Sequence, residues 1–283
     1  MKHLLSEIKS LKEQLKSEHL FLFLDYDGTL VELAERPELA VFPEHCKDLL
    51  LCMSEQSRCQ IAFVSGRGLS DLQGVIGLDD CIYAGSHGHE IAGDGLAYKH
   101  EVPHHHALIV ADVKHDLISK LGDIKGAHLE DKGICLSLHY RLCSAPDKER
   151  LKEYFRKNIS PYEEENAVRV SFGKELLEVM PVTDWNKGKA VCWILKNRPA
   201  ATFGGKALAI YIGDDHTDES AFEKLRDCGI TVHVGRGKKS RARYFVNDVG
   251  EVYEFLKYVH ACLQCSGAHA GPKIRLVGKG KSY

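Results

Sequence analysis

The sequence predicts an α/β protein whose parallel central sheet carries a smaller α+β unit as an insertion. Two observations lead to this prediction. Continuous apolar runs that end abruptly at polar turns occur at 19–24, 60–64, 80–84 and 207–212. Helical stretches lie between the early runs, which indicates strand–helix–strand units and a parallel sheet. In contrast, the middle of the chain alternates apolar and polar residues, a pattern typical of an antiparallel sheet with one solvated face.

Helices and strands alternate in the first part of the chain. Leu4, Leu5, Ile8, Leu11 and Leu15 recur at three- and four-residue steps, so we expect an amphipathic helix at 1–17 that docks on its own chain. The apolar run that follows suits a strand buried on both faces of a parallel sheet. The next elements are expected as a helix at 43–57, a strand at 60–64, a helix at 69–76 and a strand at 80–84.

The inserted unit is expected to combine two helices with a small sheet. Helical periodicity is present at 107–121 and 148–159, and strand patterns are present at 127–140 and 167–179, the latter with a turn at Phe172-Gly173-Lys174. A helix at 184–195 then returns the chain to the main unit. The expected organisation is therefore a discontinuous core of 1–102 and 183–265, an inserted domain at 103–182 and a disordered tail at 266–283.

Bulk properties exclude several classes of protein. The formal net charge of the 283 residues is -2, which gives no reason to expect nucleic acid or an anionic membrane as a partner. No targeting signal is visible, and no run reaches the ~20 apolar residues that span a membrane. The ten cysteines are scattered, with one CxxC pair, Cys262 and Cys265, and no second pair to complete a zinc site. We therefore expect a cytoplasmic protein with reduced thiols, and favour a monomer over an oligomer.

Four polar clusters are expected at one edge of the sheet. They are Asp25-Tyr-Asp-Gly-Thr29, Ser65-Gly66, Gly213-Asp214-Asp215, and Lys187 at the start of its helix. Ligands of open parallel sheets bind in the crevice outside the carboxyl ends of the strands. A single carboxylate at a strand end is usually a turn residue or a helix cap. Four clusters suited to phosphate or a metal ion instead predict a phosphate-handling site.

The residue types in these clusters fit phosphate ester cleavage. Asp25 is placed to attack phosphorus and form an aspartyl-phosphate. Asp27 is expected on the same side, where it can protonate the leaving oxygen and later activate water. Repulsion between Asp25, Asp27 and Asp214 calls for a cation, and a hard oxygen site beside phosphate favours Mg²⁺. Ser65, with the backbone amides near it, and Lys187 are expected to hold the phosphate oxygens.

These stretches resemble the four motifs of the haloacid dehalogenase superfamily of phosphotransferases. The motifs are Asp25-Tyr-Asp-Gly-Thr-Leu30, Val64-Ser-Gly-Arg67, Lys187 and Gly213-Asp-Asp-His-Thr-Asp218. The resemblance covers about two thirds of the chain. It implies a Rossmann-like core with a C2-type cap inserted between the second and third motifs.

The chain is also similar to the trehalose-6-phosphate phosphatase family. The similar stretches are Ala84-Gly-Ser-His-Gly-His-Glu-Ile91, Glu130-Asp-Lys-Gly133, Leu138-His-Tyr-Arg141, Lys174-Glu-Leu-Leu-Glu-Val179, Asp184-Trp-Asn-Lys-Gly-Lys-Ala190 and Asp214-Asp-His-Thr-Asp-Glu219. The resemblance implies hydrolysis of trehalose 6-phosphate with Mg²⁺, and a mobile cap that reads the sugar.

The resemblance also implies a role for each matching residue. Asp25 is the nucleophile and Asp27 the general acid and base, and Ser65, Gly66 and Lys187 bind the phosphate. Metal binding falls to Asp25, the Asp27 main-chain carbonyl and Asp214, supported by Asp215 and Asp218. The implied sugar contacts in the cap are Glu130, Lys132, Arg141, Lys174 and Glu178.

Some positions depart from the family pattern, and two alternatives stay open. Met180 stands where an arginine is common, and His89 and His216 replace other side chains, changes that can retune substrate preference. One alternative is a phosphatase for sucrose phosphate or another sugar phosphate. The other is a receiver-like regulatory module that accepts phosphate on Asp25, against which Asp27 and the large insert argue.

Three further signals are not expected to form functional sites. His104-His-His106 is expected in an exposed loop near the hinge of the insert, because three adjacent histidines cannot all face one ion on a regular element. Gly235–Lys239 is expected to be a solvated basic turn, and Gly204-Gly205 a loop rather than a phosphate cradle, because no helix-opening Lys-Ser/Thr follows it.

Overall fold

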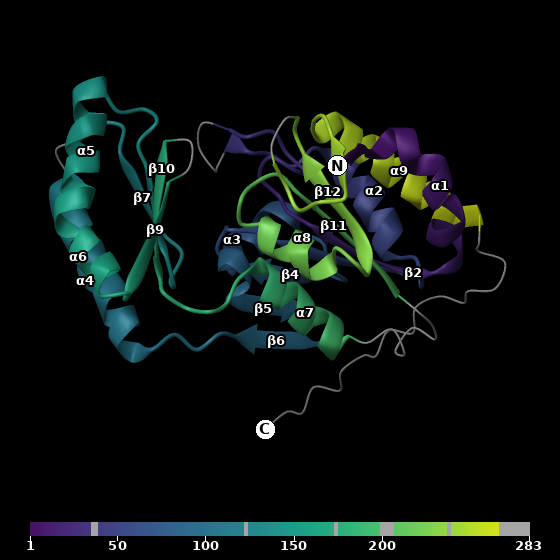
Figure 1. Ribbon diagram of the computed structural model, residues 1–283, viewed down its shortest axis with the longest axis horizontal. Coiled ribbons are helices and arrows are strands. Elements are labelled where there is room, and N and C mark those ends of the chain that lie inside the picture. Colours follow the sequence, from purple (N-terminus) through teal and green to yellow (C-terminus); the bar gives the residue numbers. More distant parts are fainter. Residues whose placement is uncertain (35–38, 122–123, 173–174, 199–206, 237–238, 266–283) are drawn as a thin grey trace.

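The computed structural model describes residues 1–34, 39–121, 124–172, 175–198, 207–236 and 239–265. Within these ranges the strands form two separate sheets, one of nine strands and one of four (Figure 1). The nine-stranded sheet, here called the core sheet, has the order β1-β13-β12-β11-β2-β3-β4-β5-β6. Its strands are β1 Lys2–His3, β2 His19–Leu24, β3 Cys59–Val64, β4 Ile82–Gly85, β5 Glu90–Gly93, β6 Leu96–Lys99, β11 Ala207–Gly213, β12 Gly229–Val234 and β13 Tyr244–Val246.

The core sheet is parallel from β1 to β4 and ends in an antiparallel hairpin of β5 and β6. Strand β2 lies between β11 and β3, with Leu22 paired to Ile210 on one side and Ile61 on the other. Residues 20–24 of this strand are all buried, as expected of a strand covered on both faces. The carboxyl ends of β2, β3 and β11 therefore meet at one edge.

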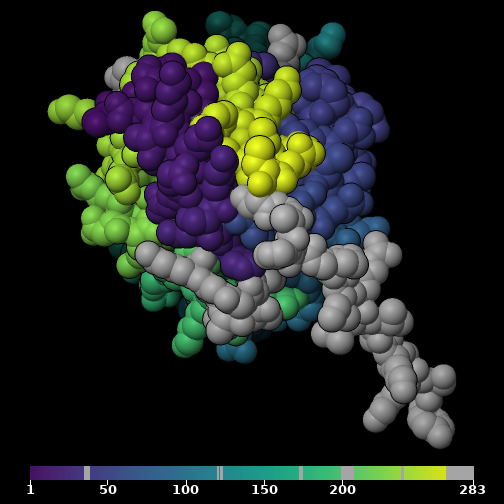
Figure 2. Space-filling model, turned by 90° about the vertical axis from the view of Figure 1, so that its right-hand side faces the viewer, coloured from purple at the N-terminus to yellow at the C-terminus, as the bar shows by residue number. Residues whose placement is uncertain are grey.

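Helices cover both faces of the core sheet. One face carries α1 Leu4–Ser17, α2 Glu44–Ser54, α3 Leu69–Ile76 and α9 Val249–Cys265, and the other carries α7 Lys187–Asn197 and α8 Glu219–Leu225. Figure 2 shows α1 and α9 side by side on the surface. Leu4, Leu11 and Leu15 of α1 are buried in this layer, so the expected docking of the N-terminal helix on its own chain is confirmed.

The second sheet, here called the cap sheet, is antiparallel throughout and has the order β7-β8-β10-β9. Its strands are β7 His128–Asp131, β8 Leu136–His139, β9 Val168–Phe172 and β10 Leu176–Pro181. The helices α4 His104–Leu121, α5 Ala145–Asn158 and α6 Ser160–Glu164 cover its outer face, and the other face is turned towards the core (Figure 1). The expected fold class, a parallel-sheet core with an inserted α+β unit, is confirmed.

Several elements differ from the expectation. The histidines at 104–106 form the first turn of α4, and His106 Nδ1 lies 3.1 Å from the carbonyl oxygen of Val182, so the loop expected there is wrong. Strands β1, β5, β6, β12 and β13 were not anticipated, because they are short or carry buried polar residues such as Thr231. Lys174, Gly204-Gly205, part of Gly235–Lys239 and the tail at 266–283 lie outside the described residues.

Two bulk expectations can be compared with the fold. None of the helices in the described ranges has both the length and the apolar character needed to cross a bilayer. All ten cysteines are free thiols, and six of them are buried. Burial raises the pKa of several of these thiols, as at Cys135, which makes them poor nucleophiles.

Candidate active site

The polar clusters expected from the sequence meet at the carboxyl edge of the core sheet. Asp25 follows β2, Ser65 follows β3, and Asp214 follows β11. Lys187 is the first residue of α7, a helix whose cap is Asn186, with the side-chain oxygen of Asn186 accepting a hydrogen bond from the Lys189 amide. The ammonium group of Lys187 therefore reaches the acids at the strand ends from the first turn of a helix.

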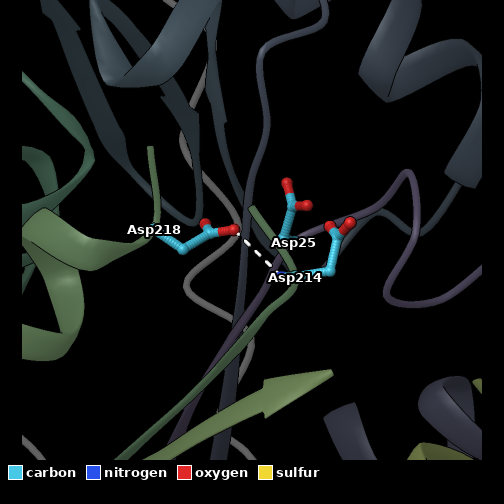
Figure 3. Close-up of side chains that lie close together, drawn as sticks. All are labelled: Asp25, Asp214 and Asp218. Carbon is cyan, nitrogen blue, oxygen red and sulfur yellow. Dashed lines mark hydrogen bonds between the residues drawn. The ribbon is translucent and has the colours of Figure 1, made fainter. Parts of the chain in front are cut away.

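Three carboxylates gather at the centre of the site. Asp25, Asp214 and Asp218 each offer an oxygen, and these oxygens lie within 4.8 Å of one another (Figure 3). Lys187 Nζ lies 3.0 Å from Asp25 Oδ1 and 2.8 Å from Asp218 Oδ1, and all three side chains are almost fully buried. One ammonium group thus pairs with two of the three clustered acids.

Burial and like charges shift the pKa values of this cluster. Burial raises the pKa of Asp25 well above its usual value; Lys187 opposes the rise, and Asp218, Asp214 and Asp215 add to it. Burial alone would lower the pKa of Lys187, yet the carboxylates of Asp218 and Asp25 hold it well above its usual value. A group of hard carboxylate oxygens this close together fits a divalent cation.

Asp218 supports the other residues of its loop. Its Oδ1 accepts hydrogen bonds from Lys187 Nζ and, at 2.7 Å, from the Tyr211 hydroxyl. Its Oδ2 accepts from the backbone amides of Asp214 and Asp215, both at 3.1 Å. Asp218 is fully buried and does not line the cavity. The structure therefore places it behind the site, where it fixes the turn that presents Asp214 and Asp215.

Close packing around the acids requires glycine at two positions. Gly28 has a φ of +84°, and a Cβ there would lie 2.3 Å from Asp214 Oδ2. A Cβ at Gly213 would lie 2.3 Å from Asp218 Cγ. Neither position can take a side chain unless the facing carboxylate shifts, so Gly28 lets the loop after β2 approach Asp214, and Gly213 lets Asp218 fold back on its own loop.

Asp27 is held by an arginine that was not among the expected site residues. Arg67 Nε lies 2.7 Å from Asp27 Oδ2, and Arg67 Nη2 lies 2.8 Å from Asp27 Oδ1. Arg67 also donates to Asp71 and stacks over the Tyr26 ring, with its Cζ 5.0 Å from the centroid. The sequence signal for Arg67 was its place in the Val64-Ser-Gly-Arg67 motif, where only Ser65 and Gly66 were given a role.

A cavity of about 640 Å³ joins the core to the cap. Its core side is lined by expected residues, which are Asp25, Asp27, Ser65, Gly66, Lys187, Asp214 and Asp215. Its cap side includes four of the five expected sugar contacts, which are Glu130, Lys132, Arg141 and Glu178. The structure thus brings together residues that are up to 190 positions apart, while Lys174 lies outside the described residues.

The cap residues form a connected polar network. Glu178 Oε1 accepts hydrogen bonds from Lys132 Nζ at 3.1 Å and from the Ser137 hydroxyl at 2.9 Å. Glu130 Oε2 lies 3.0 Å from His139 Nε2 and 3.9 Å from Lys132 Nζ. Burial raises the pKa of Glu178, but His87 and Lys132 outweigh it and hold this pKa well below its usual value. Buried charges that are paired in this way are fixed in position, and they present polar groups to the cavity.

Arg141 joins the cap to a loop of the core. Its Nη1 donates to the carbonyl oxygen of Ala34 at 2.9 Å, and both Leu33 and Ala34 line the same cavity. On the other side, Ser171 Oγ of β9 lies 3.3 Å from His216 Nε2, which follows Asp215. His216 is thus one of the family departures that stands at a core–cap contact.

The fold and site together define a phosphotransferase of the haloacid dehalogenase type. A haloacid dehalogenase-like hydrolase from Bacteroides thetaiotaomicron shares the fold, with a TM-score of 0.58 over 86% of this chain and 100% of that structure, at 14% identity. The family model of trehalose-phosphatase matches residues 23–249. The chain therefore belongs to the trehalose-phosphatase family, which favours a phosphatase over the receiver-like alternative.

Individual relatives agree with this assignment. Trehalose 6-phosphate phosphatase RA3 of Zea mays is 31% identical over 89% of this chain and 73% of its own length. Trehalose-phosphate phosphatase of Mycobacterium tuberculosis is 32% identical over 80% of this chain, which spans 57% of that protein. Among solved structures, a trehalose-6-phosphate phosphatase related protein has a TM-score of 0.68 at 26% identity, over 85% of this chain and 97% of that structure.

Proposed function

We propose that this protein hydrolyses trehalose 6-phosphate to trehalose and phosphate, in trehalose biosynthesis, with Mg²⁺ as its cofactor. The observation that carries the proposal is the cavity that core and cap residues line together. Its core side holds the acids and the lysine suited to phosphoryl transfer, and its cap side holds paired polar residues suited to sugar hydroxyls. A phosphorylated sugar that extends from one side to the other would meet both sets.

The first step is attack by Asp25. Its carboxylate oxygen forms a bond to phosphorus while the bond between phosphorus and the sugar oxygen breaks, giving an aspartyl-phosphate. Asp27 gives its proton to the leaving sugar oxygen. Both oxygens of Asp27 accept hydrogen bonds from Arg67 in the structure, so this step requires the Asp27 side chain to rotate towards the cavity that it lines.

The second step regenerates the enzyme. Asp27, now a carboxylate, takes a proton from water, whose oxygen attacks phosphorus and releases Asp25 and inorganic phosphate. Ser65, the backbone at Gly66 and Lys187 hold the phosphate oxygens in both steps. Asp25, the Asp27 carbonyl and Asp214, with Asp215 and Asp218 in support, are the groups that would hold Mg²⁺, and the chemistry the ion would supply there is neutralisation of charge on the transferring group.

The cap gives the substrate preference in this proposal. Glu130, Lys132, Arg141 and Glu178 line the cavity and are its sugar contacts, together with Lys174. We further propose that the core comprises 1–102 and 183–265 and the cap 103–182, which the two separate sheets support. A cytoplasmic location is proposed because all ten cysteines are free thiols.

A panel of sugar phosphates tests the substrate. Phosphate release is measured with trehalose 6-phosphate, sucrose 6-phosphate and glucose 6-phosphate, with Mg²⁺ and after removal of divalent ions with a chelator. We expect trehalose 6-phosphate to give the highest kcat/KM and the chelator to abolish turnover. Preference for sucrose 6-phosphate would replace the substrate, and full turnover in the chelator would remove Mg²⁺ from the mechanism.

A further inference from the structure

The short segment η2, Ser86–Gly88, has an unusual backbone. Ser86 and His87 both have positive φ, at 49° and 57°, although neither is glycine. Two consecutive residues of this kind are uncommon in proteins, and such strain persists only where surrounding contacts fix it. Both residues are buried, with 1% and 9% of their surface exposed. The contacts that fix them reach into both halves of the cavity.

On the core side, η2 is tied to the phosphate-binding loop. The His87 amide donates to the Ser65 carbonyl oxygen at 2.9 Å, and the Ser86 amide donates to the Arg67 carbonyl oxygen at 2.6 Å. The His87 ring lies against Gly66, where an added Cβ would be 2.7 Å from His87 Cε1. The segment therefore holds the loop at Ser65–Arg67 through backbone bonds and through packing.

On the cap side, the same two residues reach the sugar-binding network. His87 Nε2 lies 3.1 Å from Glu178 Oε2, and the Ser86 hydroxyl donates to the Lys132 carbonyl oxygen at 3.5 Å. Glu178 can only accept at this contact, so His87 Nε2 carries the hydrogen. The other oxygen of Glu178 is bound by Lys132 and Ser137. His87 is thus the side chain that joins the Glu178–Lys132 pair to the core.

We propose that His87 is a positioning residue for substrate specificity, which holds Glu178 over the phosphate-binding loop so that sugar and phosphate are recognised as one unit. The proposal rests on the proposed function, because it concerns the same cavity. The proposed role of His87 differs from a merely structural role in one measurable respect, which is its dependence on the substrate. A structural histidine would affect every phosphate ester alike, whereas His87 affects those substrates whose sugar reaches the cap.

The test compares two substrates of different size. Trehalose 6-phosphate would contact both sides of the cavity, whereas p-nitrophenyl phosphate has no sugar for the cap residues to bind. For His87→Ala we expect kcat/KM for trehalose 6-phosphate to fall about 10- to 100-fold, because the charged carboxylate of Glu178 loses one of its hydrogen-bond donors. We expect kcat/KM for p-nitrophenyl phosphate to fall by a clearly smaller factor, because the backbone bond from His87 to Ser65 remains and only the packing of the ring against Gly66 is lost. His87→Gln keeps a donor near the position of Nε2 and should recover most of the loss.

A matched control comes from another histidine–glutamate pair. His3 Nε2 lies 2.8 Å from Glu251 Oε2, and neither residue lines the cavity. His3→Ala should leave both kcat/KM values unchanged. The ratio of the two values for any variant does not depend on the folded fraction of the sample, so partial unfolding cannot mimic the expected result. If His87→Ala gives no folded protein, His87→Leu, which fills more of the volume of the ring but also lacks a donor for Glu178, supplies the ratio in its place.

Each other outcome has a definite meaning. An equal fall for both substrates, or no fall for trehalose 6-phosphate, overturns the inference, and so does failure of His87→Gln to exceed His87→Ala. If the wild type hydrolyses p-nitrophenyl phosphate but not trehalose 6-phosphate, the proposed substrate is wrong. The inference about His87 is then judged by the same ratio, measured with the preferred sugar phosphate from the panel.

Discussion

Lys187 is the buried cation on which the acidic cluster depends, and its replacement by methionine has a calculable effect. Lys187 Nζ makes two ion-paired hydrogen bonds, to Asp25 at 3.0 Å and to Asp218 at 2.8 Å, and the three side chains are 2%, 6% and 0% exposed. Methionine fills a similar volume but carries no charge. Removing one partner of a buried ion pair costs about 3–5 kcal/mol, because the remaining charges are left uncompensated.

The sign and pH range of this effect follow from the titration of the cluster. The pKa of Lys187 is raised in the folded state, so its stabilisation is fully present below the unfolded pKa and is lost only as pH rises through the folded pKa. A measurement at about pH 7.5 therefore captures the whole effect, since an unfolded lysine titrates near 10.4. Burial raises the pKa values of Asp25 and Asp218, so Lys187→Met should become less destabilising as the pH falls and these carboxylates are protonated.

Urea-induced unfolding without divalent ions measures the free energy of unfolding. Fluorescence follows the core selectively, because the two tryptophans, Trp185 and Trp193, both pack against its α7 side. Lys189→Met is the matched control on the same helix, since Lys189 pairs with Asp184 at the surface, where the two side chains are 38% and 81% exposed. A surface pair of this kind contributes about 1 kcal/mol or less.

The comparison of the two variants decides the outcome. Lys187→Met should unfold at least about 2 kcal/mol more easily than Lys189→Met. Equal stabilities would show that Asp25 and Asp218 do not depend on the lysine, and the charge argument for the site would fail. Addition of Mg²⁺ to each variant then reports whether a cation binds at the cluster, because a ligand that binds the folded state raises its stability.

Three further predictions concern turnover, pH and packing. Asp27→Asn should lower kcat by at least about 100-fold, measured by phosphate release, while the circular dichroism of the folded state stays unchanged. Burial lowers the pKa of His89 to about 4, so the unfolded state binds more protons below pH 6.5, and stability at pH 5 should drop by about 2 kcal/mol, a drop that His89→Asn removes in urea unfolding. Gly28→Ala should displace Asp214 and weaken Mg²⁺ binding in calorimetry, whereas Gly74→Ala, in open space on a helix, should stabilise by up to about 1 kcal/mol.

Each of these predictions has a result that would contradict it. Near-normal turnover of Asp27→Asn would remove Asp27 as the acid and base. An unchanged pH dependence in His89→Asn would assign the acid sensitivity to other groups. Normal Mg²⁺ affinity in Gly28→Ala would mean that the loop after β2 moves without disturbing Asp214.

The sequence was sufficient to predict the core of the site, because each of these residues is marked by a pattern in its own neighbourhood of the sequence. A continuous apolar run marks a buried parallel strand, and the first polar residues after it mark the edge where ligands bind. Asp25, Ser65 and Asp214 each follow such a run, and the structure brings them to one edge. The N-terminal helix and the two-sheet organisation followed in the same way from periodicity.

The relations between distant polar side chains were decided only by the tertiary structure. His87 and Glu178 are 91 residues apart, and no pattern of periodicity indicates that one would meet the other across the cavity. Arg67 holds both oxygens of Asp27, and Asp218 lies behind the cavity. The sequence did not predict either placement, because each depends on how separate loops pack together. Periodicity determines which residues face a core, whereas the pairing of buried charges is determined by the relative placement of whole segments, which no single segment encodes.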